Sequence, residues 1–128
     1  MPEHDVKPPQ RLCASAELQE RGKAVSFDVI QWREPLRAFA LRFDGRAVAY
    51  LNRCAHVPAE MDWQEGEFLD GDKRFIMCSI HGAVYEPLTG QCVMGPCNRG
   101  RLTKIEVTER DGEVYWHPTR DTLPAFED

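Results

Sequence analysis

Alternation of apolar and polar residues predicts a chain built from short strands joined by turns. In residues 24–30 the apolar side chains fall on every second position, which is the period of a β-strand. Residues 36–43 carry Phe39, Leu41 and Phe43 on one side and the set Ala38, Ala40 and Arg42 on the other. Asp44-Gly45 then forms a two-residue turn into a return strand over residues 46–52. This pattern predicts a β-hairpin in the first half of the chain.

The rest of the chain repeats the pattern with shorter segments. Residues 15–22 are interpreted as one helical turn or a tight connection, because glycine follows two glutamates there. The other predicted elements are a first strand at 11–14, a short strand at 75–77, a departing segment at 82–85, a turn at 87–90, and a final hairpin of 101–109 and 112–117. The expected fold class is therefore all-β.

Length and proline content predict a single domain. At 128 residues, with 42% hydrophobic residues, the chain is long enough to bury a core of its own. Residues 1–10 hold three prolines and residues 118–128 hold two, so we expect a flexible arm and a tail at the two ends. The folded domain is predicted to span residues 11–117.

Charge and hydropathy exclude two function classes. The formal net charge is −5 at pH 7, which argues against nucleic-acid binding. No apolar run approaches the roughly 20 residues that span a bilayer. The N-terminus lacks the basic-then-apolar pattern of a signal peptide. We expect a cytoplasmic protein with no membrane anchor.

Two short stretches carry the candidate chemistry. Cys54-Ala55-His56 and Cys78-Ser79-Ile80-His81 each offer one thiolate and one imidazole, and residues 57–77, a gap of 21, separate them. Two cysteines and two histidines are enough to close one metal site. Zinc would accept this set. A structural zinc site, however, usually pairs its cysteines and then its histidines, whereas here the two types alternate.

The residues after the second pair favour iron and sulfide. They read Gly82-Ala83-Val84-Tyr85-Glu86-Pro87-Leu88-Thr89-Gly90, followed by Gly95-Pro96. Cys-x-His, then Cys-x-x-His-Gly, an aromatic residue, a Thr-Gly turn and a Gly-Pro loop form the signature that this chain shares with Rieske proteins. The resemblance runs from about residue 12 to residue 117. Two departures are the long gap and Pro58, which stands where many members carry glycine.

The resemblance implies one [2Fe–2S] cluster per chain, with Cys54 and Cys78 on one iron and His56 and His81 on the other. It implies a Rieske-like antiparallel β-sandwich with a small cluster-binding subdomain of two loops, at about residues 53–98. The chain is similar to soluble Rieske ferredoxins, which shuttle single electrons from a reductase to an oxygenase or similar terminal enzyme. Such a carrier has no catalytic residues of its own.

Two alternatives stay open at this point. The small electron-transfer subunit of a nitrite reductase shares the fold but can lack the ligands, which are intact here. A zinc-bound or metal-free interaction module is the second alternative. The absorption spectrum of the anaerobically purified protein would distinguish iron–sulfur from zinc.

Residues beside the ligands bear on the reduction potential. Ala83 occupies the position where high-potential Rieske proteins carry a serine that donates to a bridging sulfide, while Tyr85 matches their tyrosine. Gly82 follows the second ligand pair, and Pro96 belongs to the loop that covers Rieske clusters. The resemblance thus implies a potential toward the lower part of the range of roughly −150 to +300 mV. Trp63, Ile80 and Pro96 are candidates for a hydrophobic collar or for plain core.

Three cysteines remain outside the ligand set: Cys13, Cys92 and Cys97. High-potential Rieske proteins join their two loops by a disulfide at positions that are Pro58 and Ile80 here, so that disulfide is absent. Cys92 and Cys97 flank the Gly95-Pro96 loop closely enough for a disulfide, but in a reducing cytosol we expect both to be thiols. The acidic stretch 57–72 is interpreted as a solvated loop in preference to a docking rim.

Overall fold

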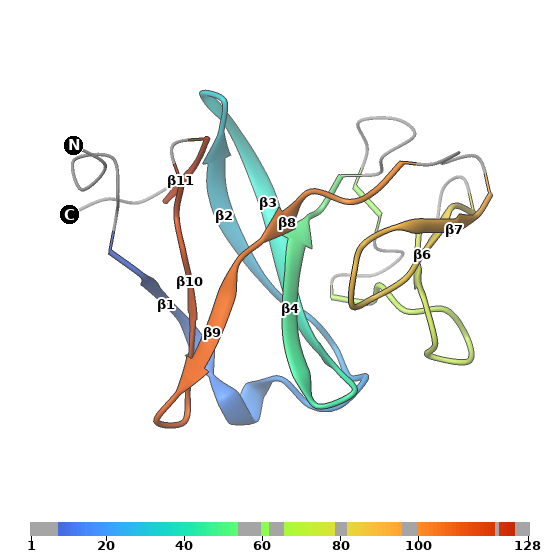
Figure 1. The fold of residues 1–128 in the computed structure, drawn as a ribbon, viewed down its shortest axis with the longest axis horizontal. Coiled ribbons are helices and arrows are strands. Elements are labelled where there is room, and N and C mark those ends of the chain that lie inside the picture. The colour runs from blue at the N-terminus through green and yellow to red at the C-terminus, as the bar shows by residue number, and fades with distance from the viewer. Residues whose placement is uncertain are drawn as a thin grey trace.

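A computed structural model describes residues 8–53, 60–61, 66–78, 82–95, 100–119 and 121–124. Within these ranges the regular structure consists of antiparallel strands and one 3-10 turn, η2 (Ser15–Glu17) (Figure 1). The all-β fold expected from the alternating pattern is therefore confirmed. No helix in the described ranges is long and apolar enough to cross a membrane.

Two sheets form a sandwich, which we call the base. The larger sheet has the strand order β11 (Thr122–Pro124), β2 (Val25–Gln31), β3 (Glu34–Phe43), β4 (Arg46–Leu51) and β8 (Lys104–Ile105). The smaller sheet has the order β1 (Gln10–Ala14), β10 (Glu113–Trp116) and β9 (Val107–Arg110). Small side chains of the larger sheet, such as Ala38, Ala40 and Ala49, pack with Val114 and Trp116 of the smaller one. Their size lets the two sheets approach closely.

A third sheet lies beside the base, at the right of Figure 1. It consists of β5 (Ile76–Met77), β6 (Val84–Tyr85) and β7 (Cys92–Met94), in that order. We call residues 60–61, 66–78 and 82–95 the cluster-binding part. Its core is made with the large side chains of β3 and β4, because these point away from the sandwich. Phe39, for example, stacks on Phe68 with ring centroids 3.7 Å apart.

The central hairpin of β3 and β4 thus serves two cores at once. Along β3, alanines face the sandwich, whereas Phe39 and Leu41 face the cluster-binding part. Both faces of the hairpin are buried, so the run Ala38–Leu41 is less than 2% exposed throughout. The hairpin is the rigid element on which the cluster-binding part rests.

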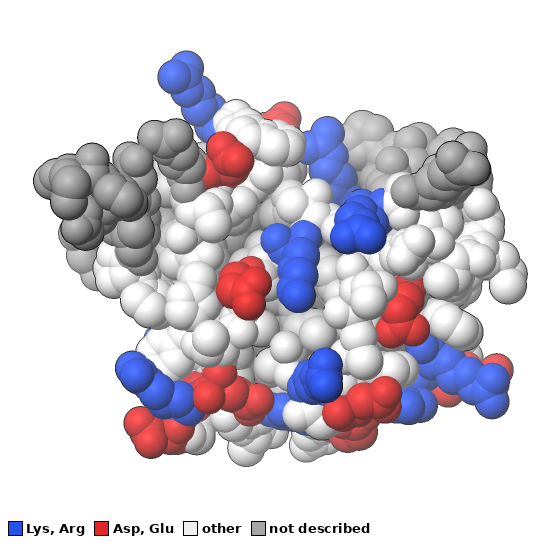
Figure 2. Space-filling model, viewed as in Figure 1, with Lys and Arg blue, Asp and Glu red and all other residues white. Residues whose placement is uncertain are grey.

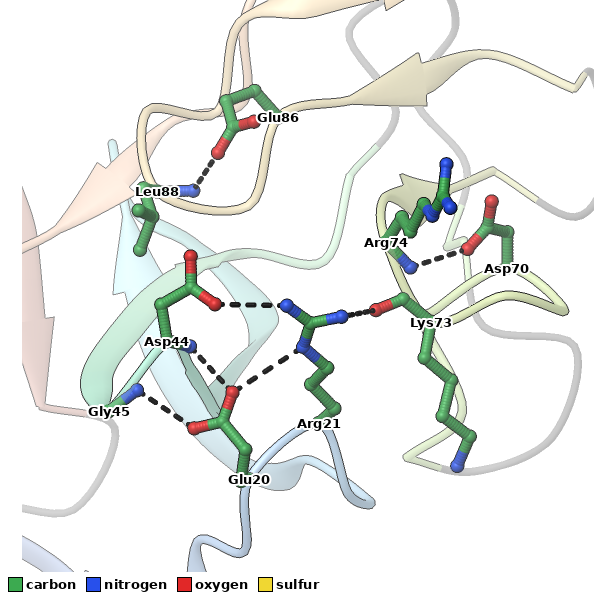
Figure 3. A network of polar contacts seen from close by, with 9 residues as sticks. All are labelled: Glu20, Arg21, Asp44, Gly45, Asp70, Lys73, Arg74, Glu86 and Leu88. Carbon is green, nitrogen blue, oxygen red and sulfur yellow. Dashed lines mark hydrogen bonds and ion pairs between the residues drawn. The ribbon is translucent and has the colours of Figure 1, made fainter.

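A polar network at the Asp44-Gly45 turn also ties the two parts together (Figure 3). The Glu20 carboxylate accepts hydrogen bonds from the backbone N–H groups of Asp44 and Gly45, at 2.7 and 2.8 Å. These bonds lower the pKa of Glu20. Arg21 pairs with Asp44 at 2.9 Å and donates to the backbone oxygen of Lys73 at 3.3 Å. One guanidinium therefore bridges the base and the cluster-binding part.

The structure corrects three details of the predicted elements. The predicted strand 101–109 is two strands in different sheets, because β8 pairs with β4 whereas β9 pairs with β10. The predicted tail contains β11, an edge strand paired with β2 and held by a buried hydrogen bond from Thr122 to Gln31. Strand β7 was not predicted, because its three residues carry no alternation. The 3-10 turn η2 ends five residues before the predicted connection 15–22 does, and the remaining strand boundaries agree within one or two residues.

Candidate metal centre

The first ligand stretch follows directly from β4. Leu51 ends that strand, and the Arg53 N–H donates to the Leu51 oxygen at 2.9 Å, which turns the chain. Cys54 and His56 lie outside the described residues. The approach to them is nevertheless fixed, because β4 is paired on both edges, by β3 and β8.

Asn52 closes this first loop. Its side chain is 7% exposed, and its Oδ1 accepts the N–H of Met61 at 2.7 Å. The Asn52 N–H donates to the Arg37 oxygen at 2.9 Å, so the residue is anchored to β3. Asn52 therefore ties the far end of the loop to its beginning. Sequence reasoning missed this role, although a polar residue between a buried strand and a candidate ligand was a usable signal.

The second ligand stretch begins at the end of β5. Cys78 is fully buried and is not in a disulfide. Its N–H donates to the Ala83 oxygen at 2.8 Å, and the Gly82 N–H donates to the Cys78 oxygen at 2.8 Å. These bonds extend the β5–β6 pairing to Cys78 and Ala83 and hold Gly82 next to Cys78. His81 lies outside the described residues, between Cys78 and Gly82 in the sequence.

Two glycines near Cys78 have positive φ, and one of them, Gly95, is also closely packed. Gly82 has φ +74° and Gly95 has φ +91°, in the region that L side chains rarely adopt. A Cβ on Gly95 would lie 2.7 Å from the Gly82 oxygen and 2.9 Å from the Ala83 Cα. The start of the Gly95-Pro96 loop therefore rests directly on the second ligand loop. Pro96 itself lies outside the described residues.

The predicted neighbours of the cluster are buried beside Cys78. Ala83 and Tyr85 are both 0% exposed and belong to the same core as Cys78. In the same core, Tyr50 donates its hydroxyl to the Pro87 oxygen at 2.7 Å, and burial raises the pKa of Tyr50. This side of the site is dry, so hydrogen bonds to sulfur would be strong there.

The prediction for Cys92 is wrong, because Cys92 is disulfide-bonded in the structure. Its partner lies outside the described residues, as does Cys97. The expectation of a thiol rested on a reducing cytosol alone and took no account of how the chain folds around Cys92. Here Gln91 pairs with Arg101, and the Cys92 N–H donates to the Gly100 oxygen at 2.9 Å, so the chain between them doubles back on itself. Cys13, by contrast, is a buried thiol whose pKa burial raises to about 11.

The acidic stretch is more than a solvated loop. Met61 and Phe68 within it are 0% and 2% exposed and belong to the core. Asp70 accepts the backbone N–H of Arg74 at 2.9 Å, so at least one of the acids shapes a turn (Figure 3). Trp63 and Ile80, proposed for a hydrophobic collar, lie outside the described residues.

Comparison with known proteins identifies the family. The model of the Rieske [2Fe-2S] domain family matches residues 9–127. The chain therefore belongs to the Rieske [2Fe–2S] domain family, and a [2Fe–2S] cluster is its cofactor. A search of curated protein sequences finds no match.

Solved structures show the same fold. The ferredoxin of carbazole 1,9a-dioxygenase from Nocardioides aromaticivorans IC177 superposes with a TM-score of 0.69 at 21% identity, over 88% of this chain and 100% of that one. A Sphingomonas yanoikuyae B1 ferredoxin gives 0.62 at 24% identity, over 86% and 98%. The terminal oxygenase of carbazole 1,9a-dioxygenase from Novosphingobium sp. KA1 gives 0.63 at 23% identity, over 94% of this chain and 30% of that one.

The described residues fit the cluster of this family. A [2Fe–2S] centre needs deprotonated thiols that are not tied up in disulfides, on a loop with little room for other groups. Cys78 meets these conditions, since it is buried, not disulfide-bonded and followed by a loop closed by two backbone hydrogen bonds.

Proposed function

We propose that the protein is a one-electron carrier that takes electrons from a reductase and passes them to an oxygenase or a similar terminal enzyme. The observation that carries this proposal is the family match over residues 9–127. This chain covers the whole length of one dioxygenase ferredoxin, whereas it covers 30% of one terminal oxygenase.

In this proposal Cys54 and Cys78 hold one iron, and His56 and His81 hold the other. The bound cluster supplies a reversible one-electron step. Cys78 would keep one iron in the dry core, whereas imidazoles add no charge and so favour reduction. Gly95 lets the backbone before Pro96 approach Gly82 and Ala83 closely. Ala83 has no hydroxyl to donate to a sulfide, so we expect a potential in the lower part of the Rieske range.

Protein-film voltammetry tests this function directly. A carrier should give one reversible wave that corresponds to a single electron, which is 59 mV per decade in a redox titration. No wave from protein with bound zinc would overturn the proposal in favour of a structural module.

A further inference from the structure

Three basic residues lie on the face of the base that carries β4 and β8: Arg46, Arg101 and Lys104. All three are exposed. Figure 2 shows basic side chains close together over this part of the molecule, with acidic side chains to either side of them. The chain as a whole has a formal charge of −5, so a basic surface here does not follow from its composition. We call these three residues the basic face.

Arg46 and Lys104 lie along the same strand pair. Lys104 lies opposite Tyr50 in the β4–β8 ladder, and Arg46 begins β4. Both residues line one groove of about 190 Å³, together with Val48, Leu88 and the carboxylate of Glu106. Two cations against one carboxylate leave this groove with a net positive charge, which suits a protein segment that carries carboxylates.

The three charges are available to a partner. Among the described residues, none of the three takes part in an ion pair. Five other arginines do, each with an aspartate or glutamate: Arg11, Arg21, Arg37, Arg42 and Arg53. Glu106, which lines the same groove, offsets part of this charge, and the net positive charge that is left acts on an approaching molecule over about a Debye length.

Two exposed apolar side chains lie on β7, the strand that follows the bridge between Gln91 and Arg101. Val93 and Met94 of β7 are 51% and 67% exposed. Arg101 is linked to them through its bridge to Gln91, the residue before β7. Met94 precedes Gly95, which packs on the second ligand loop. A partner that covers these two side chains would thus come close to the metal centre.

We propose that Arg46, Arg101 and Lys104, together with Val93 and Met94, form the docking surface for a redox partner protein that presents an acidic patch. The proposal rests on the proposed function as an electron carrier. Apolar contact would supply the centre of the interface, and the charges would steer the encounter. The acidic stretch 57–72, considered earlier as a docking rim, is not part of this surface.

The test compares two one-electron acceptors of opposite surface charge. The reduced holoprotein is mixed with plastocyanin, which is acidic, and with cytochrome c, which is basic; one electron passes from the cluster to Cu(II) or to Fe(III). With plastocyanin at low ionic strength, Arg101→Glu with Lys104→Glu should lower the second-order rate by about tenfold or more. The same variant should not slow the reaction with cytochrome c. Lys104→Arg, which keeps the charge, should react at the wild-type rate.

Arg110→Glu is the matched control, because Arg110 is exposed on the β9–β10 hairpin, away from the groove. It should change the plastocyanin rate by no more than about twofold. Equal slowing by each of two single variants, Arg110→Glu and Lys104→Glu, would show that only net charge matters. That result, or an unchanged rate in the double variant, would overturn the proposal.

A second readout separates docking from electron transfer. Reduction of the cluster by dithionite is recorded first, and a wild-type protein that accepts no electron defeats the proposed function alone. Docking is then decided by NMR titration with redox-inert, cadmium-substituted plastocyanin. Amide shifts confined to the basic face and β7 would support it. Shifts elsewhere, or shifts that depend only on the protein's own concentration, as in self-association, would overturn it.

Discussion

The base and the cluster-binding part are both antiparallel, but they are held together in different ways. Strands β2 and β3 of the base share seven paired residues from Val25 to Gln31. Strands β5 and β6 of the cluster-binding part share two pairs. Long ladders of hydrogen bonds hold the base together. The cluster-binding part is held instead by the positive-φ glycines Gly82 and Gly95, the buried side chain of Asn52 and the backbone hydrogen bonds around Cys78.

This difference has a consequence for folding. A long ladder with a core on each side specifies its own register. Two-residue strands bury too little apolar surface to order a loop by themselves. The cluster-binding part therefore relies on its contacts with the β3–β4 hairpin and on metal ligation to order its loops. Mutations in the two parts should separate stability from cluster properties.

The largest expected difference is between two buried thiols. Cys78→Ser should abolish cluster assembly, because a serine cannot replace the thiolate on iron. Cys13→Ser, in the base, should keep the full cluster and cost stability alone, since burying a hydroxyl there is unfavourable. Iron and sulfide analysis of both variants decides. A Cys78→Ser protein with two irons and two sulfides per chain would remove Cys78 from the ligand set.

Two glycines give the next comparison. Gly95→Ala should destabilise the cluster-binding part by roughly 2–4 kcal/mol, because a Cβ there meets backbone as well as a positive φ. Gly45→Ala, in the base turn, has a positive φ but no atom within 4 Å of its Cβ, so it should cost about 1 kcal/mol. Visible absorbance during heating follows the release of the cluster from the Gly95→Ala protein. Far-UV circular dichroism measures the unfolding of both variants. Equal costs at both sites would contradict the close packing of Gly95 on the ligand loop.

Ala83→Ser should raise the reduction potential. A new hydroxyl donor to a charged sulfide is worth about 1.5–3 kcal/mol in the dry core. That range corresponds to roughly 60–130 mV for one electron. Ala40→Ser is the control, because Ala40 is equally buried but faces the sandwich. It should lower stability and leave the potential unchanged. No shift in Ala83→Ser would mean that its side chain does not reach the sulfide.

Asn52→Ala should loosen the first loop. Removal of the amide leaves the buried Met61 N–H without its acceptor, which costs about 1–3 kcal/mol. Cluster loss on dilution should become faster. The counterpart in the base is Thr122→Val, which leaves Gln31 without its hydrogen bond and should lower stability by a similar amount without affecting cluster retention. If both variants lose the cluster at the same rate, Asn52 has no special role.

The smallest effect concerns pH and lies in the base. Arg42 lowers the pKa of Glu109 below its ordinary value of 4.5. The ion pair therefore stabilises the fold above pH 4.5, and the contribution is lost as the pH falls through the lower folded-state pKa. For this partly exposed pair it is no more than about 1 kcal/mol. Urea unfolding of the wild type and Glu109→Gln at pH 7 and pH 3.5 should show a smaller difference at the lower pH.

The sequence predicted the base better than the cluster-binding part, for physical reasons. Strands β2, β3 and β4 alternate clearly, and the Asp44-Gly45 turn is a strong hairpin signal. The β2–β3 turn was missed because Trp32 and Arg33 occupy it with φ of +49° and +68°, and neither is a usual turn residue. Strand β11 was missed because the proline at its end indicated a tail.

For the candidate metal site, local spacing predicts the ligand stretches, whereas contacts between distant residues were not predictable. The bond from Met61 to Asn52 and the packing of Gly95 on Gly82 each join segments that no short motif connects. The disulfide at Cys92 depends likewise on a reversal of the chain after β7. Such features follow from tertiary pairing and not from local pattern.

The most direct test of the central claim is metal analysis with EPR on anaerobically purified protein. The account predicts two irons and two acid-labile sulfides per chain. It also predicts a coloured oxidised form and, after dithionite reduction, the EPR signal of a mixed-valence [2Fe–2S] centre with nitrogen hyperfine coupling from imidazole ligands. A colourless protein with one zinc and no sulfide would contradict the account. So would a cluster whose reduced form shows no nitrogen coupling.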